Sequence, residues 1–458
     1  MYNRLLTESL PLSRSFCLLG AKGVGKTTLI RDFAANFINP VHLDLETAED
    51  RGIFQPGMTN DETLRAICFL KGKEFLGNGT LIVLDEIGLC PEAIRWTRGR
   101  GDKGTGGRGD NGTGGRGDKD GPMIVATSSF LSKELMTLTT PENGLMQSFY
   151  LHPFSFEEFL MVLNDIPALE AFREVPVPYY AYEKLLNYFH LYALIGGMPQ
   201  IIAAYTANHN LTELKYIYDK IHEGFVQCLQ HATAARKSLV LAVDVLQNAY
   251  PYAATRISLN RFGNLEKGSR EIGKAFKALE HTFSLRMIFP VTTARLPLMP
   301  DLTKFPRLQM LDTGLVNYFS GIQKPLFQSH DMNAIFEGQI ARQVVGQEIL
   351  ATMPEASGPF FWVRKKAQSS AAVDFVVPFD ELLIPVVVRS GEAGRLRSLH
   401  QYVDESPHPF AVRLHAGKLT IQQSVTIKGK RFFLMNLPYF LAGKIREHLG
   451  GFKKYVEG

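Results

Sequence analysis

Residues 20–28 read Gly-Ala-Lys-Gly-Val-Gly-Lys-Thr-Thr, which fits the pattern G-x-x-x-x-G-K-[ST] of a phosphate-binding loop, the Walker A motif. Its glycines let the backbone wrap closely around a polyphosphate, so that successive N–H groups are directed at the phosphate oxygens. Residues 15–19 form a short apolar run typical of a buried strand, and residues 28–33 open an amphipathic helix whose N-terminus attracts anions. The order of strand, loop and helix predicts that a nucleotide binds here through its phosphates.

The residues of this motif have separate expected roles. Lys26 is expected to act in catalysis by placing its charge at the β- and γ-phosphates. The Thr27 hydroxyl is expected to complete the ligand shell of a Mg²⁺ ion. The full nucleotide-binding set consists of Gly20, Ala21, Lys22, Gly23, Val24, Gly25, Lys26, Thr27 and Thr28.

A second, acidic motif follows at residues 81–86, Leu-Ile-Val-Leu-Asp-Glu, which has the form of a Walker B strand. Asp85 is expected to hold Mg²⁺ through water, and Glu86 to orient or deprotonate the attacking water as a catalytic residue. A buried strand that ends in two carboxylates is common by itself. Its position after a complete Walker A motif is what favours a nucleoside triphosphate and Mg²⁺ as ligands.

Bulk properties predict a cytoplasmic, globular protein. The chain of 458 residues is long enough for two or three domains, and its 45% apolar and 21% charged content is ordinary. It has no apolar stretch of the ~20 residues that a membrane span needs, and its first residues lack the apolar core of a secretory signal. The four cysteines show no C-x-x-C spacing, so neither a zinc site nor a disulfide framework is expected. The net charge of +5 permits nucleic-acid binding without requiring it.

Up to about residue 151, short apolar runs alternate with helical patterns, which predicts a parallel α/β sheet. A strand is expected at residues 41–45, and a helix capped by Asn60 or Asp61 at residues 61–69.

A further apolar strand, at residues 123–129, ends in small hydroxyl side chains. Thr127 and Ser128 are the candidates to sense the γ-phosphate or to position water, and Ser128 is counted as catalytic. The alternative is that these residues only cap the following helix at residues 130–135.

The segment at residues 98–121 contains no apolar side chain and repeats with a period of eight residues. Such a composition cannot bury a core, so a flexible, solvated loop is expected. Arg-Gly-Asp occurs in it three times, which raises integrin adhesion and nucleic-acid contact as alternatives. The favoured interpretation is an expanded linker, at a place where a helix normally connects two parallel strands.

Residues 153–332 show a helical pattern rich in aromatic side chains, with helices expected at 154–160, 185–195 and 211–229. Residues 256–260, 272–279 and 283–291 predict a helix-turn-helix with a following β-wing. Four cations in this stretch are expected to meet either DNA phosphates or water: Lys267, Arg270, Lys274 and Lys277. From about residue 334 the pattern changes to strands, expected at 360–364, 373–377, 383–388, 418–421 and 432–435.

The order of these motifs resembles that of prokaryotic ATPases with an N-terminal AAA-like domain and a C-terminal domain related to PD-(D/E)XK nucleases. The matching pieces are the Walker A loop, LDEIGLCPEA (84–93), LHPFSFEEFL (151–160), IGGMPQ (195–200), LDTGL (311–315), FEGQIARQV (336–344) and VDFVV (373–377). The resemblance implies ATP as the nucleotide. It also implies a P-loop ATPase core of α/β fold at 1–151, a helical lid and winged-helix-like region at 152–332, and a nuclease-like α/β domain at 333–458.

Departures from this family's pattern bear on mechanism. By the resemblance, Glu337 and Asp374 are the first two metal-binding carboxylates, but Val387 stands where a third is required, and it cannot bind a metal. Arg389 stands where a lysine activates water, and an arginine stays protonated. DNA cleavage is therefore not expected. Ala372 stands where such proteins often carry a glutamate. Leu145 stands where the family commonly has an arginine that could act at the γ-phosphate. Slow hydrolysis, or another arginine in that role, is therefore expected.

The sequence thus predicts a Mg²⁺-dependent ATP-binding protein that hydrolyses ATP slowly and acts as a nucleotide-controlled switch, with duplex DNA or a protein as its partner. The alternative is a scaffold that binds ATP without hydrolysis and carries an inactive nuclease-like domain. A third interpretation, an ATP-dependent nuclease, would require metal-dependent cleavage that is lost in Asp374→Ala. No oligomeric state is predicted.

Overall fold

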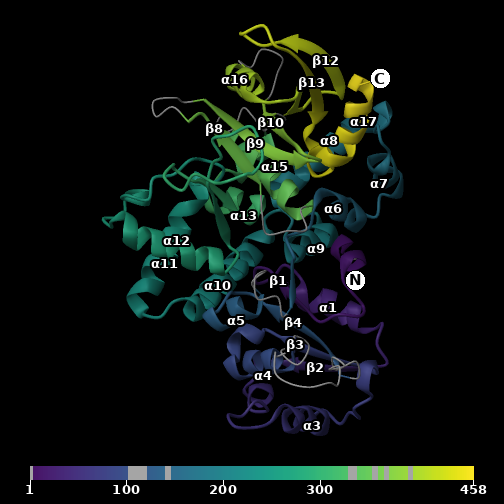
Figure 1. Cartoon of the computed structure of the whole chain (residues 1–458), viewed down its shortest axis with the longest axis vertical. Coiled ribbons are helices and arrows are strands. Elements are labelled where there is room, and N and C mark those ends of the chain that lie inside the picture. The colour runs from purple at the N-terminus through teal and green to yellow at the C-terminus, as the bar shows by residue number, and fades with distance from the viewer. Residues whose placement is uncertain are drawn as a thin grey trace, which may run out of the picture.

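The computed structural model describes residues 4–101, 121–139, 146–328, 338–352, 359–365, 371–389 and 396–457. Most of the predicted repeat loop, the Leu145 position and Glu337 lie outside these ranges. Figure 1 shows three regions that follow one another along the long axis, with the N-terminal region at one end and the C-terminal sheet at the other.

The N-terminal region is built on a parallel sheet in the order β2-β3-β4-β1-β5, which confirms the predicted α/β fold. The carboxyl ends of parallel strands lie at one edge of a sheet. The Walker A loop after β1, the Walker B carboxylates after β3 and the hydroxyl side chains after β4 therefore meet there. The strands are β1 (Phe16–Leu19), β2 (Asn39–Asp44), β3 (Thr80–Asp85), β4 (Met123–Ser128) and β5 (Gln147–Tyr150).

Helices cover both faces of this sheet. Leu29 and Phe33 of α1 (Lys26–Ala34) join one core with Leu18 and Val83 of the strands. The other face packs against helices α3 (Asn60–Leu70), α4 (Pro91–Gly101) and α5 (Lys133–Thr139), and α2 (Ala48–Arg51) follows β2.

Two expectations for this region are corrected. The cap of α3 is Thr59, whose side chain forms a capping box with Glu62, so the helix begins one residue after it. A helix, α4, does lead from β3 toward β4, and it extends over residues 98–101, where a loop was expected. The residues before 98 supply apolar side chains, including Ile94 and Trp96, that cover the sheet.

The middle region contains most of the helices. Ser155 caps α6 by a capping box with Glu158, and Gly196, with φ of 82°, ends α8. The helices are α6 (Phe156–Leu163), α7 (Ile166–Arg173), α8 (Tyr182–Ile195), α9 (Pro199–Asn208), α10 (Leu214–Ala232), α11 (Arg236–Ala249), α12 (Ser269–His281), α13 (Thr313–Phe319) and α14 (Gln323–Gln328).

A two-stranded antiparallel sheet follows α12, formed by β6 (Leu285–Ile288) and β7 (Arg307–Met310). The helix expected at residues 256–260 is absent. Ile257 N donates to Pro306 O at 2.9 Å and Ala254 N to Leu308 O at 2.7 Å, so this segment runs beside β7 and its backbone is bonded to that strand. The helix that pairs with α12 is α11, which lies earlier in the chain.

The C-terminal region has a six-stranded mixed sheet in the order β12-β13-β11-β10-β9-β8. All five expected strands are present, and β11 was not predicted. The elements are α15 (Gln339–Thr352), β8 (Phe360–Val363), β9 (Ala372–Phe379), β10 (Leu382–Val388), α16 (Arg397–Glu405), β11 (Phe410–His415), β12 (Thr420–Val425), β13 (Arg431–Pro438) and α17 (Ile445–Glu457).

One apolar core connects the three regions. Phe16 of β1, Phe189 of α8 and Val386 of β10 belong to the same cluster of buried side chains. The described helices include none long and apolar enough to cross a membrane.

Candidate nucleotide-binding site

The Walker A loop joins β1 to α1 and depends on glycine for two different reasons. Gly23 and Gly25 have φ of 89° and 97°, in the left-handed region that side chains rarely adopt, and Gly25 is the N-cap of α1. At Gly20 the reason is close approach, because a methyl group there would lie 2.4 Å from the carbonyl oxygen of Leu151 at the end of β5.

The ammonium group of Lys26 lies under this loop and is only 4% exposed. Its Nζ donates to the carbonyl oxygens of Gly20 and Ala21 at 3.0 and 3.3 Å. It also donates to Ser129 Oγ at 2.6 Å and lies 3.4 Å from Glu86 Oε1. The expected phosphate-binding lysine and the expected catalytic carboxylate are therefore brought together as a buried ion pair.

Glu86 follows the last residue of β3 in the left-handed conformation, with φ of 56°. Ser129 N donates to Glu86 Oε2 at 2.7 Å, and the Ser129 hydroxyl donates to Oε1. Burial favours the protonated acid, but the Lys26 charge and the two hydrogen bonds from Ser129 have the larger combined effect and lower the pKa of Glu86. The carboxylate is consequently ionised at neutral pH.

Thr27 and Asp85 form the second pair expected from the sequence. Thr27 Oγ1 donates to Asp85 Oδ2 at 2.8 Å. The Thr127 hydroxyl donates to the other carboxylate oxygen and accepts from Glu86 N at 3.1 Å, which fixes the Asp85 side chain. His42 Nε2 lies 3.9 Å from Asp85 Oδ2.

These two oxygen donors fit a Mg²⁺ ion that a nucleotide helps to bind. The part of the chain that the structure describes holds no cluster of three or more His, Cys, Asp or Glu side chains able to bind a metal without help. Mg²⁺ is usually held by one or two protein oxygens together with water and substrate phosphates. The hydroxyl of Thr27 and the carboxylate of Asp85 would supply that protein share.

The structure places Ser129, rather than Ser128, against Lys26 and Glu86, the residues predicted to be catalytic. Ser128 Oγ donates to Phe130 O at 2.6 Å and faces Gly88, away from Lys26 and Glu86. Side chains of a strand alternate between its two sides, so Ser129 continues the side of Thr127, which contacts Asp85. This two-residue period was the signal in the sequence that could have identified Ser129.

Side chains from distant segments hold the outside of the loop. A methyl group on Gly23 would lie 3.4 Å from Met198 Cε, and one on Gly25 would lie 3.8 Å from Pro199 Cγ, so the start of α9 packs against the loop. Gly224 of α10 lies against the side chain of Lys22, where a methyl group would be 3.3 Å from Cγ.

Arg4, which precedes the short helix Leu5–Ser9, also supports the loop. It donates to Val24 O at 2.9 Å and pairs with Glu158 at 2.8 Å, and it is 9% exposed. Arg4 belongs to no motif, and Met198, although it lies in IGGMPQ (195–200), was not predicted to contact the loop.

The nuclease-like site predicted in the C-terminal region has a different chemistry. Asp374 Oδ2 accepts from Arg389 Nη1 at 3.0 Å and from Val388 N at 2.9 Å, so its carboxylate is paired with a cation. Val387 is buried and apolar. This donor set does not fit a catalytic metal, and the absence of nuclease activity stays a prediction.

Comparison with known families divides the chain. Residues 13–160 match the family described as an AAA domain, and residues 186–326 match a domain of unknown function, DUF8612. No match is found among curated proteins.

Two solved structures show a distant similarity to this chain. The Orc1 protein of Aeropyrum pernix in complex with DNA is 11% identical, covers 70% of this chain and 90% of its own, and has a TM-score of 0.27. The Hef helicase domain of Pyrococcus furiosus is 11% identical, covers 91% of this chain and 90% of its own, and has a TM-score of 0.19. These scores are low, so the interpretation rests on the AAA match and on the geometry of the site. The N-terminal region is similar to AAA domains, and its parallel sheet carries an AAA-like P-loop with Walker A and Walker B residues in contact.

Proposed function

We propose that this protein binds ATP together with Mg²⁺, hydrolyses it slowly, and uses the bound nucleotide to control its middle and C-terminal regions. The observation that carries the proposal is the paired arrangement at the strand ends: Lys26 beside Glu86, and Thr27 beside Asp85. Each pair combines a phosphate-directed or metal-directed group with the carboxylate that its chemistry requires.

In this proposal each side chain has one task. Thr27 and Asp85 hold Mg²⁺, which neutralises charge on the phosphates when bound. A polyphosphate in the loop takes the place of the Gly20 and Ala21 carbonyls as the partner of the Lys26 ammonium, which loosens the ion pair with Glu86. The Glu86 carboxylate then accepts a proton from the attacking water.

The lowered pKa of Glu86 supports slow rather than fast turnover. A general base works best when its pKa lies near the working pH, and Lys26 and Ser129 move the pKa of Glu86 further below that range. Lys26 both binds phosphate and keeps the pKa of Glu86 low. The rate of hydrolysis therefore depends on how far the Lys26 ammonium moves away from the Glu86 carboxylate.

The switch is supported by contacts that run from the loop to the C-terminal region. Met198 and Pro199 pack on the loop, and the preceding Gly197 donates its N–H to Asp312 Oδ2 at 2.6 Å. Gln347 of α15 donates to the same oxygen at 3.4 Å, and its Oε1 accepts from Thr313 N at 2.8 Å. A displacement of the loop by a nucleotide would therefore reach Gln347 of α15 through Met198, Gly197 and Asp312.

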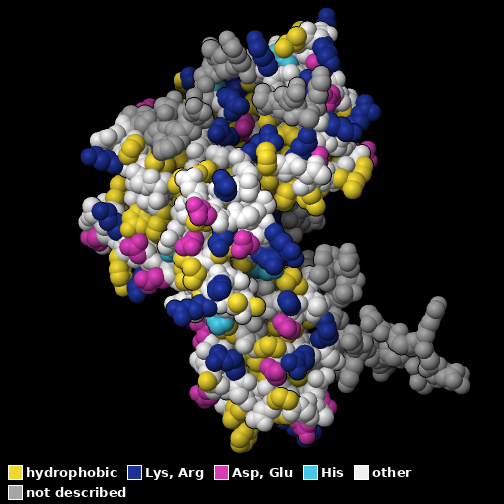
Figure 2. Space-filling model, turned by 90° about the vertical axis from the view of Figure 1, so that its left-hand side faces the viewer, with side chains coloured by type: hydrophobic (Ala, Val, Ile, Leu, Met, Phe, Trp, Pro, Cys, Tyr) yellow, Lys and Arg dark blue, Asp and Glu magenta, His cyan; other side chains and the backbone are white. Residues whose placement is uncertain are grey.

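Duplex DNA is the partner that the charges favour. Arg270, Lys274 and Lys277 are exposed on α12, the helix before the β6–β7 sheet, as a winged-helix module that meets phosphates would require. On the face seen in Figure 2, Lys and Arg side chains also gather at the upper end of the molecule, which Figure 1 identifies mainly as the C-terminal region.

The test is steady-state ATP turnover with Mg²⁺ for the wild type and Glu86→Gln, each with and without duplex DNA. Loss of the general base should reduce turnover by about 10²-fold or more. Glu170→Gln, the same substitution at an exposed position of α7, is the matched control and should leave the rate unchanged.

Stimulation of the wild type by DNA, lost at higher salt, would support the DNA partner. If both proteins bind ATP and neither turns it over, the enzyme proposal fails and the non-hydrolysing scaffold is correct. A loss of ATP binding in Lys26→Ala should accompany either result.

A further inference from the structure

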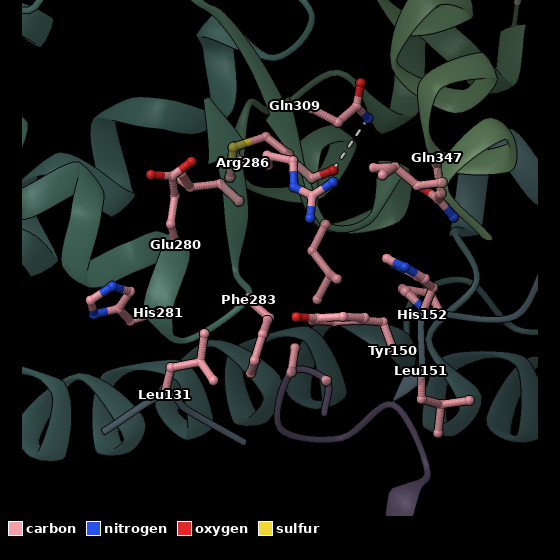
Figure 3. Close-up of a pocket in the computed structure, with 17 residues that line it drawn as sticks. Leu131, Tyr150, Leu151, His152, Glu280, His281, Phe283, Arg286, Gln309 and Gln347 are labelled. Carbon is pink, nitrogen blue, oxygen red and sulfur yellow. Dashed lines mark hydrogen bonds between the residues drawn. The ribbon is translucent and has the colours of Figure 1, made fainter. Parts of the chain in front are cut away.

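A cavity of about 230 Å³ lies where the three regions of the chain meet. Gly20 and Ala21 of the Walker A loop line it, as do residues 150–153 after β5, residues around the end of α12, strands β6 and β7, and α15. Figure 3 shows Arg286 and Tyr150 projecting into the same space, with Phe283 on one side and His152 on the other. Sites for drug-sized ligands usually measure ~300–1,000 Å³, so only a compact molecule fits here.

The guanidinium of Arg286 is the unusual feature of this cavity. Arg286 is half-buried, yet among the residues that the structure describes none makes a hydrogen bond or an ion pair with its side chain. Burial lowers the pKa of Arg286. A charge removed from water without a partner is costly, and an anion in the cavity would offset that cost.

Among the residues that the structure describes, one carboxylate lines the cavity, and it does not supply this partner. Glu280 Oε1 accepts from Met287 N at 2.8 Å, and Figure 3 shows the carboxylate apart from the guanidinium. It attracts Arg286 only through space.

The other polar side chains add donors beside Arg286. The Tyr150 hydroxyl has no hydrogen-bond partner within the described ranges, and burial raises its pKa, so it stays protonated and able to donate. Burial, reinforced by the nearby Arg286 and Arg4, lowers the pKa of His152 to about 3 and keeps its ring neutral.

Apolar walls surround this polar end. The rings of Tyr150 and Phe283 meet edge to face, with centroids 6.2 Å apart. Five leucine side chains also line the cavity: Leu131, Leu151, Leu285, Leu311 and Leu350. Such a lining suits a ligand with one polar group and an apolar body.

We propose that this cavity binds a small organic anion, whose single carboxylate or phosphate group pairs with Arg286 and Tyr150 and whose ring-sized apolar body packs against Phe283. The site is separate from the phosphate-binding face of the loop, although Gly20 and Ala21 line both. Its occupation needs no ATP hydrolysis.

The experiment is isothermal titration of the full chain with three probes that share one body: benzoate, phenyl phosphate and uncharged benzyl alcohol. At least one anion should bind with one site per chain, and the alcohol should not. The two anions distinguish a carboxylate ligand from a phosphate ligand. Arg286→Gln should weaken binding at least about tenfold, because a charge-assisted pair is lost.

Arg65→Gln, at an exposed position of α3, is the matched control and should bind like the wild type. Leu131→Trp fills the cavity from another wall and should also abolish binding, which keeps the test decisive if Arg286→Gln does not fold.

Absence of binding by both anions, equal binding of the alcohol, or full binding to a folded Arg286→Gln or Leu131→Trp would overturn the proposal. Lys26→Ala should no longer bind ATP and should still bind the anionic probe. A failure of the ATP proposal is therefore distinguished from a failure of this one.

Discussion

Removal of the Lys26 ammonium should leave the Glu86 carboxylate buried without its cation. At the observed 3.4 Å and an effective dielectric constant of about 20, the attraction between the two charges is about 5 kcal/mol before desolvation is counted. Breaking a buried pair on one side costs roughly 3–5 kcal/mol. Lys26→Met should therefore lower the free energy of unfolding by about 3 kcal/mol, and adding Glu86→Gln should restore about 2 kcal/mol of it.

The assay is urea unfolding of the four proteins of this double-mutant cycle. The chain has two tryptophans, Trp96 and Trp362, so a Trp362→Phe background leaves Trp96 of α4 as the reporter of the N-terminal region. Arg31→Met, at an exposed position of α1, is the matched control and should cost less than about 0.5 kcal/mol.

The pH dependence has a definite sign in this cycle. The pKa of Glu86 is lowered in the folded wild type, so its contribution to stability is present above the ordinary pKa of a glutamate and is lost as the pH falls through the folded value. In Lys26→Met the buried carboxylate has lost its cation, so its protonation relieves the cost, and the deficit seen at pH 7 should shrink toward pH 4. Additive effects of the two substitutions, within about 0.5 kcal/mol, would refute the reasoning.

Three further outcomes are expected. Gly20→Ala should destabilise the protein by about 1–3 kcal/mol in urea unfolding, because its methyl group would meet Leu151 O at 2.4 Å, whereas Gly268→Ala has open space and should be nearly neutral. Ser129→Ala should lower ATP turnover by about tenfold or more through loss of hydrogen bonds to charged groups, and Ser128→Ala should not; equal effects would contradict the assignment. Burial raises the pKa of Glu348 to about 8, so the wild type should lose stability as the pH rises from about 4.5 to 8. Glu348→Gln should consequently exceed the wild type by at least about 1 kcal/mol at pH 8, with a gap that closes toward pH 5, and exposed Glu49→Gln should show no such trend in thermal unfolding.

The sequence was sufficient for the parts of the site that are local in the chain. The Walker A loop and the carboxylates after β3 follow from short motifs, because one turn and one strand end determine them. Alternation along β4 would have selected Ser129, but the preceding Thr127 and Ser128 carry the same hydroxyl chemistry. The predicted residue, Ser128, therefore lies one position before Ser129, the residue that contacts Glu86.

Contacts between distant segments could not be predicted from short motifs. Arg4 reaches Val24 and Glu158, and Met198 reaches Gly23, across the folded chain, and no local pattern predicts either contact. The helix expected at residues 256–260 was wrong for the same reason, since its backbone groups bond to a segment about fifty residues later.

The continuous apolar core has a consequence for how this protein can be divided. Cutting the chain at residue 151 would expose Phe156, Phe159 and Phe189, which pack in the same cluster as Phe16 and Leu18 of the first sheet. Each of the two fragments would carry apolar side chains that had lost their packing partners, and each would tend to aggregate. A replacement for the N-terminal region, taken from another protein, would therefore have to preserve this shared packing. The three regions are expected to be inherited as one unit.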